Sequence, residues 1–191
     1  ALVVCDMPFM SCQVSVTDTV RNAGRLVKEG RAQAVKLEGG ADFCDEVRGL
    51  TRASIPVMGH LGLTPQSVNA FGGYKVQGKS LAAAQKLLDD ARALQEAGAF
   101  SLVLECVPAA LAARVSKELE IPVIGIGAGP ECDGQVLVWQ DMLGLCDTVA
   151  PKFVKRFGEV GEAMRAAFTV YAQEVKGGTF PAEEHCYSLE D

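Results

Sequence analysis

Polar residues capable of acid–base chemistry stand within or at the ends of short apolar runs. Lys36 and Glu38 lie two residues apart in the run AVKLE, so in a β-strand both side chains would point to the same face. Asp6 ends the run LVVCD, His60 follows PVMG, and Glu105 ends SLVLE. Carboxylates, a lysine and an imidazole on one rim could hold a hard cation such as Mg²⁺, bind a 2-oxo acid and remove a proton beside its ketone.

Each of these residues also has a purely structural interpretation. Lys36 and Glu38 could form an ion pair of their own, His60 could be a hydrogen-bonded loop histidine, and Asp6 could begin a turn. Glu105 is harder to explain in this way, because a buried charge in an apolar strand needs a partner. The five positions together favour a site, since they come at the ends of successive apolar runs.

Short apolar runs alternate along the chain with segments of helical period. Strands are expected at residues 1–7, 32–38, 56–60, 100–107, 123–129 and 134–141. Thr17 and Asp18 can cap a helix that closes at Gly30. Further helices are expected around residues 43–50, 81–94, 108–119 and 152–176, with a mobile tail over residues 179–191.

Regular alternation of strands and helices predicts an α/β fold with a parallel sheet. A doubly wound sheet and a β/α barrel both satisfy the pattern. The polar strand ends favour the barrel, whose enzymes gather their chemistry at the carboxyl rim of the strands. About six units are counted where a (β/α)8 barrel has eight, and the chain opens inside an apolar run. We therefore expect one barrel domain over residues 1–191 that lacks its first two units.

Composition excludes some classes of protein. The chain has 191 residues and a net charge of −6, and its 18 Lys and Arg residues are spread out, which argues against a nucleic-acid partner. No apolar run approaches the length of a membrane span. Seven cysteines without CxxC spacing are typical of a reduced cytoplasmic protein. The GIGAG stretch at residues 125–129 lacks the full spacing of a dinucleotide-binding loop.

The stretch GHLGLTPQSVNAFGGYKVQGK at residues 59–79 closely resembles a signature of the ketopantoate hydroxymethyltransferase family. The resemblance continues through VKLEGG, LVLECVP, IPVIGIGAG, DGQVLVWQD and FPAEEH, and so covers nearly the whole chain. It implies a (β/α)8 TIM barrel of the phosphoenolpyruvate-utilising type, assembled as a homo-oligomer, commonly a decamer. The implied reaction passes a hydroxymethyl group from 5,10-methylenetetrahydrofolate to 3-methyl-2-oxobutanoate and gives 2-dehydropantoate for pantothenate biosynthesis, through a Mg²⁺-stabilised enolate.

The resemblance also implies roles for individual residues. Asp6 in CDMPF and Glu38 in KLEGG resemble the metal-binding carboxylates, and Asp6 also lies where substrate binds. Lys36 resembles the residue that binds the carboxylate of the keto acid. Glu105 in LECVP resembles the general base, and His60 in GHLG resembles a residue near the substrate oxygen. No residues are predicted to hold the folate.

Two alternatives stay open at this point. Relatives in the family carry an upstream stretch with a Gly-Asp-Ser strand end, whose aspartate binds the metal and whose serine binds substrate. A chain without that stretch could be an inactive remnant that serves only in binding or assembly. A folate-independent, Mg²⁺-dependent 2-oxo-acid lyase or aldolase is the other alternative, and the long loop after His60 argues against it.

Overall fold

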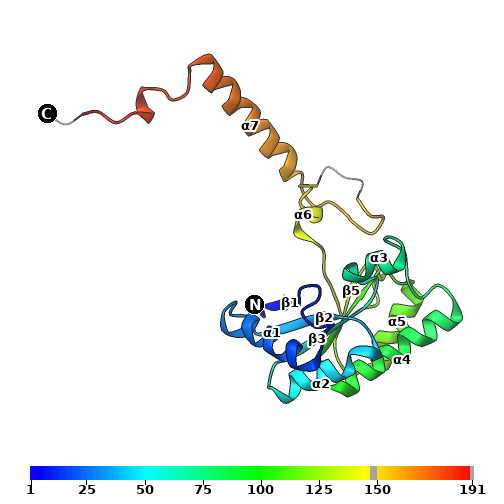
Figure 1. Ribbon diagram of the computed structural model, residues 1–191. Coiled ribbons are helices and arrows are strands. Elements are labelled where there is room, and N and C mark those ends of the chain that lie inside the picture. The colour runs from blue at the N-terminus through cyan, green and yellow to red at the C-terminus, as the bar shows by residue number, and fades with distance from the viewer. Residues whose placement is uncertain (147–149, 190–191) are drawn as a thin grey trace. The chain divides into compact units, whose positions relative to one another are not determined.

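A parallel β-sheet forms the centre of the first part of the chain (Figure 1). The computed structural model describes residues 1–146 and 150–189. The chain divides into two compact units, Ala1–Val136 and Leu137–Asp191. The whole sheet, and every residue predicted to act in the site, belongs to the first unit.

The six strands lie side by side in the order in which they occur in the chain. They are β1 (Val4–Asp6), β2 (Ala34–Glu38), β3 (Val57–Gly62), β4 (Ser101–Glu105), β5 (Val123–Ile126) and β6 (Gly134–Gln135). All neighbouring strands are parallel. A doubly wound sheet reverses its strand order at a switch point, whereas sequential order with right-handed crossovers places every helix on the same face. The order is therefore that of a β/α barrel.

Four helices pack against the sheet (Figure 1). They are α1 (Val16–Lys28), α2 (Cys44–Arg52), α4 (Leu81–Ala97) and α5 (Ala109–Glu118). Short segments complete the connections: the 3₁₀ turns η1 (Ala41–Phe43) and η2 (Pro65–Ser67), and the single-turn helix α3 (Val68–Phe71). The turn η2 and the helix α3 lie in the loop after β3, within the stretch at residues 59–79 that resembles the family signature.

Serine side chains begin two of the helices. The Ser15 hydroxyl accepts a hydrogen bond from the Asp18 amide at 3.1 Å, so α1 begins before the Thr17 and Asp18 that the sequence indicated. Ser80 caps α4 in the same way through the Ala83 amide at 3.2 Å. Helix α4 runs to Ala97, a little beyond the predicted 81–94, and is closed by Gly98, whose φ of 105° is a conformation that favours glycine.

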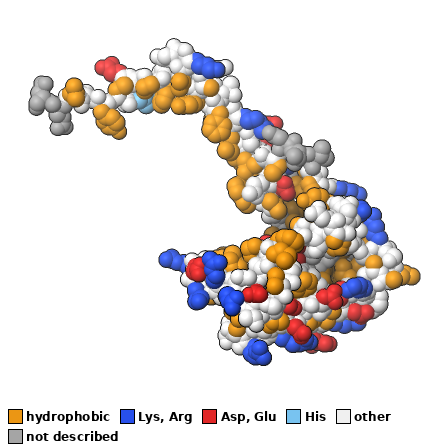
Figure 2. All heavy atoms as spheres, in the orientation of Figure 1, with side chains coloured by type: hydrophobic (Ala, Val, Ile, Leu, Met, Phe, Trp, Pro, Cys, Tyr) orange, Lys and Arg blue, Asp and Glu red, His pale blue; other side chains and the backbone are white. Residues whose placement is uncertain are grey.

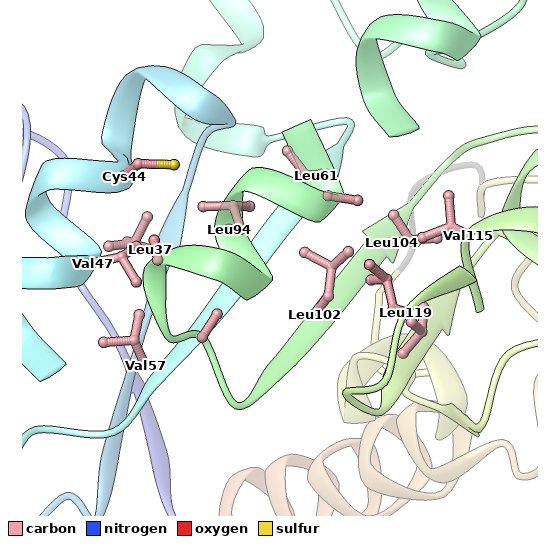
Figure 3. Close-up of a cluster of buried hydrophobic side chains, with 14 of the residues drawn as sticks. Leu37, Cys44, Val47, Val57, Leu61, Leu94, Leu102, Leu104, Val115 and Leu119 are labelled. Atoms are coloured by element: carbon pink, nitrogen blue, oxygen red, sulfur yellow. The ribbon is translucent and has the colours of Figure 1, made fainter. Parts of the chain in front are cut away.

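Alternate residues of the strands fill the core between sheet and helices. Val35, Leu37, Val57, Leu102, Leu104 and Val123 are at most 1% exposed. Figure 3 shows side chains of β2, β3 and β4 gathered with Val47, Leu94 and Val115 from the helices. Apolar burial of this kind stabilises a fold by roughly 1.5–3 kcal/mol per large side chain.

The second unit contains α6 (Trp139–Met142), α7 (Val160–Gly177) and a 3₁₀ turn, η3 (Glu183–His185). The strand predicted at 134–141 is wrong beyond Gln135, because β6 pairs with β5 at only two positions and the chain then turns into α6. Helix α7 begins at Val160 rather than at 152. Figure 2 shows hydrophobic side chains along α7, and its exposed apolar residues are Val160, Met164, Phe168, Val170, Tyr171 and Val175.

Candidate active site

Register places all five predicted residues on the same face of the sheet. Asp6 is paired with Lys36, and Glu38 is paired with His60. His60 is in turn paired with Val103, two residues before Glu105. Paired residues of parallel strands share a face, and so do residues two apart in one strand. The five side chains therefore lie on the face opposite the apolar core.

Lys36 connects the first strand of the sheet to the third. Its ammonium nitrogen lies 3.0 Å from Oδ1 of Asp6 and 2.9 Å from Nδ1 of His60. The lysine side chain is 14% exposed, while that of Asp6 is 63% exposed. The carboxylate of Asp6 is thus accessible to solvent, and the lysine beneath it is held at a fixed place.

The Lys36 contact determines which nitrogen of His60 carries the proton. An ammonium group donates hydrogen bonds and cannot accept them, so Nδ1 of His60 is the acceptor and the neutral ring carries its proton on Nε2. Nε2 lies 3.3 Å from Oε2 of Glu105. The angles there do not make a hydrogen bond, and Nε2 is a buried donor without a partner among the described residues. A substrate oxygen is the kind of group that would complete such a donor.

Glu38 is the most buried of the three carboxylates. The residue is 9% exposed, and its Oε2 accepts a hydrogen bond from the main-chain amide of Gln66 at 2.9 Å. Its Oε1 lies 3.9 Å from Nδ1 of His60. One oxygen is therefore held by the loop after β3, and the other faces the Lys36–His60 pair.

The main chain around Glu105 is tightly constrained. The Leu63 amide donates to the Glu105 carbonyl at 2.8 Å, and a Cβ at Gly62 would collide with that carbonyl oxygen. Cys106 has a φ of 48°, a left-handed conformation uncommon for a residue other than glycine. Its amide and carbonyl are both hydrogen-bonded, to Ile126 and Gln77. Strain held by surrounding contacts in this way is a feature of functional sites.

The thiol beside Glu105 is not an activated nucleophile. Burial raises the pKa of Cys106, and the Glu105 carboxylate raises it further. A reactive cysteine requires a lowered pKa, because the thiolate is the nucleophile. Cys106 is therefore not included among the candidate catalytic residues.

Comparison with known proteins identifies the family. A family model for ketopantoate hydroxymethyltransferase matches residues 1–183. Proteins named 3-methyl-2-oxobutanoate hydroxymethyltransferase are 61% identical in Enterococcus faecalis and 60% identical in Clostridium novyi, each over 190 residues. The chain belongs to the ketopantoate hydroxymethyltransferase family. These alignments cover 100% of this chain and 69% of each relative, so the chain spans about two thirds of their length.

A solved structure supports the fold independently of sequence. The crystal structure of a candidate phosphonomutase from Burkholderia cenocepacia superposes with a TM-score of 0.51, over 92% of this chain and 71% of that one, at 16% identity. The predicted α/β barrel architecture is confirmed for the described strands: six parallel strands in sequential order form a curled half-barrel.

The donor chemistry of the face fits Mg²⁺, the cation expected for the family. Asp6 and Glu38 offer carboxylate oxygens near Lys36, and Mg²⁺ commonly binds through one or two carboxylates while water and substrate fill the other positions. Among residues 1–146 and 150–189, no group of three or more His, Cys, Asp or Glu residues is arranged to hold a metal ion. With two carboxylates from this chain, water and substrate oxygens would have to complete the coordination of the cation.

Sequence reasoning missed two glutamines near the site. Gln66 contacts Glu38 and the carbonyl of Met7, and Gln13 contacts the side chain of Gln66. Both lie in loops, where no periodic pattern indicates which way a side chain points. The position of Gln66 inside the family-like stretch was the only available signal.

A cavity of about 250 Å³ lies elsewhere, beside α1. None of the five predicted residues lines it; the lining residues are Pro8, Ser11, Asn22, Arg25, Leu26, Glu29 and Gly30. The polar contacts described above, rather than this cavity, locate the candidate site. No helix in the described part of the chain has the length and apolar character needed to cross a bilayer.

Proposed function

We propose that this chain transfers a hydroxymethyl group from 5,10-methylenetetrahydrofolate to 3-methyl-2-oxobutanoate and gives 2-dehydropantoate for pantothenate biosynthesis. Family membership supports the reaction. The observation that carries the assignment of residues is the connected set Asp6–Lys36–His60–Glu105, in which each neighbouring pair of side chains lies within 3.3 Å.

Lys36 and the two carboxylates are assigned to binding. The ammonium group of Lys36 neutralises the carboxylate of the keto acid, and its contacts with Asp6 and His60 hold it in place for that task. Asp6 and Glu38 would hold Mg²⁺. When bound, the cation polarises the keto oxygen of the substrate and so acidifies the hydrogen on C3.

Glu105 and His60 are assigned to the chemical step. Glu105 takes the proton from C3, and its side chain is 16% exposed, so little water competes for it. The N–H of His60 at Nε2 is available to donate a hydrogen bond to a substrate oxygen. The carbon that has lost its proton then bonds to the methylene carbon of the folate. Both C–N bonds of that carbon break, water supplies the hydroxyl group, and tetrahydrofolate leaves with the C3 proton and the second proton of the water on its nitrogens.

A cytoplasmic, homo-oligomeric enzyme is part of the same proposal. All seven cysteines are free thiols, as expected for a reducing compartment. The exposed apolar stripe of α7 fits burial in an assembly, for which the family resemblance implies a decamer. The single barrel domain over residues 1–191 remains a prediction.

Isotope exchange without the folate tests the first half of this function. The chain is incubated in D₂O with 3-methyl-2-oxobutanoate and MgCl₂, and the C3 proton signal is followed by NMR. We expect the signal to disappear at a rate proportional to protein concentration, and excess EDTA to abolish the loss. Addition of 5,10-methylenetetrahydrofolate should then yield 2-dehydropantoate.

A folded chain that causes no exchange and makes no product would contradict the proposal. Exchange without product would contradict the folate-dependent step and favour a lyase. Exchange that survives EDTA would remove the cation from the scheme.

A further inference from the structure

One residue of the loop after β3 contacts two strand ends of the candidate site. The main-chain amide of Gln66 donates to Oε2 of Glu38 at 2.9 Å, and its side-chain Nε2 donates to the carbonyl of Met7 at 2.8 Å. Met7 directly follows Asp6, the last residue of β1. We propose that Gln66 is a positioning residue that fixes the Glu38 carboxylate relative to the end of β1, and thereby fixes the spacing of the two candidate metal ligands.

A chain of hydrogen bonds sets the orientation of the Gln66 side-chain amide. The Cys12 amide donates to Oε1 of Gln13 at 3.2 Å, and Nε2 of Gln13 donates to Oε1 of Gln66 at 3.2 Å. Because the oxygen of Gln66 accepts from Gln13, its NH₂ group must face the Met7 carbonyl. Each hydrogen bond in this series therefore has one donor and one acceptor, from the Cys12 amide at one end to the Met7 carbonyl at the other.

The end of β1 is held by β2 and by the core, and Gln66 adds a contact from the loop after β3. The Met7 amide donates to the Lys36 carbonyl at 2.8 Å, and the Met7 side chain is fully buried. Strand β1 has three residues and pairs within the described chain only with β2. The Asp6 side chain is 63% exposed and contacts Lys36, and exposed ion pairs contribute at most about 1 kcal/mol. The Met7 carbonyl is therefore a point at which the loop can hold β1 in place. Without the Gln66 side chain, we expect the loop after β3 to move more freely relative to β1, which stays paired with β2.

The hydrogen bond to Glu38 also makes the two carboxylate oxygens different. Oε2 already accepts from the Gln66 amide, whereas Oε1 lies 3.9 Å from Nδ1 of His60 and faces the side where a cation or its water would bind. Partners that orient a metal-binding carboxylate commonly change metal affinity 10–100-fold when removed. This part of the inference rests on the proposed function.

Gln66→Met tests the inference, because methionine keeps the length of the side chain and removes its amide. Two quantities are measured in the full chain: the hydrogen-exchange protection of the residue 66 amide without metal, by NMR, and the dissociation constant of Mn²⁺, by electron paramagnetic resonance. We expect protection to fall about tenfold and the dissociation constant to rise about tenfold. Thermal unfolding should show that the variant is folded.

Gln77→Met is the matched control from the same loop. The Gln77 side chain donates to the nearby Lys75 carbonyl, at 2.9 Å, and not to a residue of the candidate site, so both quantities should stay within twofold of those of the unmodified chain. Gln13→Met should give a smaller change of the same sign as Gln66→Met.

Protection and Mn²⁺ affinity that both remain within twofold in Gln66→Met would overturn the inference. If the unmodified chain binds no Mn²⁺ and has no activity, the proposed function fails instead. Hydrogen exchange in the metal-free protein then still decides whether Gln66 holds Glu38.

Discussion

The two faces of the sheet use alternate residues of the same strands for opposite purposes. On the face toward the helices, Leu37 and Leu104 are at most 1% exposed and pack in the apolar core. Their direct neighbours Lys36, Glu38 and Glu105 lie on the other face in a network of polar contacts. The pleat of a strand therefore provides both the core and the site, and a register slip of one residue would exchange them.

The two faces differ in what they contribute to stability. Burial of apolar side chains stabilises the fold, whereas a buried polar group must find partners merely to offset its desolvation. Lys36, His60 and Glu38 have such partners, yet Nε2 of His60 has no hydrogen-bond partner within residues 1–146 and 150–189. Substitutions on the polar face should therefore affect catalysis far more than stability, and those on the apolar face should do the reverse.

Glu105→Gln should give the largest effect in the molecule. The amide keeps the size of the side chain but cannot take a proton, so deuterium exchange at C3 should slow by about 10²–10⁴-fold. Because the side chain is 16% exposed and its contact with His60 is not a hydrogen bond, the melting temperature should change little. Proton NMR and thermal unfolding measure the two quantities.

Glu118→Gln is the control, since Glu118 is the last residue of α5 and forms ion pairs with Arg92 and Arg114 rather than with a residue of the candidate site. Exchange in this control should equal that of the unmodified chain. An exchange rate that barely changes in Glu105→Gln would show that another group is the base.

Leu104→Ala should give the converse result. Leu104 is fully buried in the core cluster, and removal of such a side chain costs about 2–5 kcal/mol because of lost burial and the cavity left behind. Urea unfolding measures the loss. The exchange rate per folded molecule should fall much less than in Glu105→Gln, and an equal fall would break the distinction between the faces.

Much of this division could be predicted from the sequence. Alternation in AVKLE and SLVLE placed Lys36, Glu38 and Glu105 on one face. Side chains of a strand change face at every residue, so the few residues of each strand are enough to predict which of them share a face. Gln66 and the left-handed Cys106 were not predictable, since tertiary contacts determine how loop residues point. The late start of α7 was missed for a related reason: apolar spacing fits a helix before 160, but no capping side chain marks where it begins.

The pKa of Cys12 provides a test of whether the apolar core excludes solvent close to the polar face. The residue is 1% exposed, and burial, followed by the charges of Glu46 and Glu38, raises its pKa to about 11. An unfolded thiol ionises near its ordinary pKa, so between pH 9 and 11 the folded state binds more protons. Stability present below pH 9 is then lost as pH rises, by on the order of 2–3 kcal/mol.

Urea unfolding of the unmodified chain and of Cys12→Ala, at several pH values from 8 to 11, measures how much stability is lost through the Cys12 thiol. The unmodified chain should lose stability more steeply than the variant across that range. Parallel curves would show that the thiol is not desolvated and that the core is open to solvent at this point.

A matched pair of valines gives the smallest and most direct comparison of the two faces. Val57 faces the helices, is fully buried and belongs to the core cluster, whereas Val103 is 7% exposed, lies on the polar face and is outside that cluster. Both substitutions to alanine remove the same two methyl groups, worth about 0.8 kcal/mol each when fully buried. Val57→Ala should therefore cost about 2 kcal/mol with its cavity term included, and Val103→Ala less than about 1 kcal/mol.

Val103 is paired with His60 and lies two residues before Glu105, so its loss should instead slow C3 exchange, a change that Val57→Ala should not produce. Equal losses of stability from the two variants would mean that the polar face is packed as tightly as the core, and that its interior is not available to a substrate.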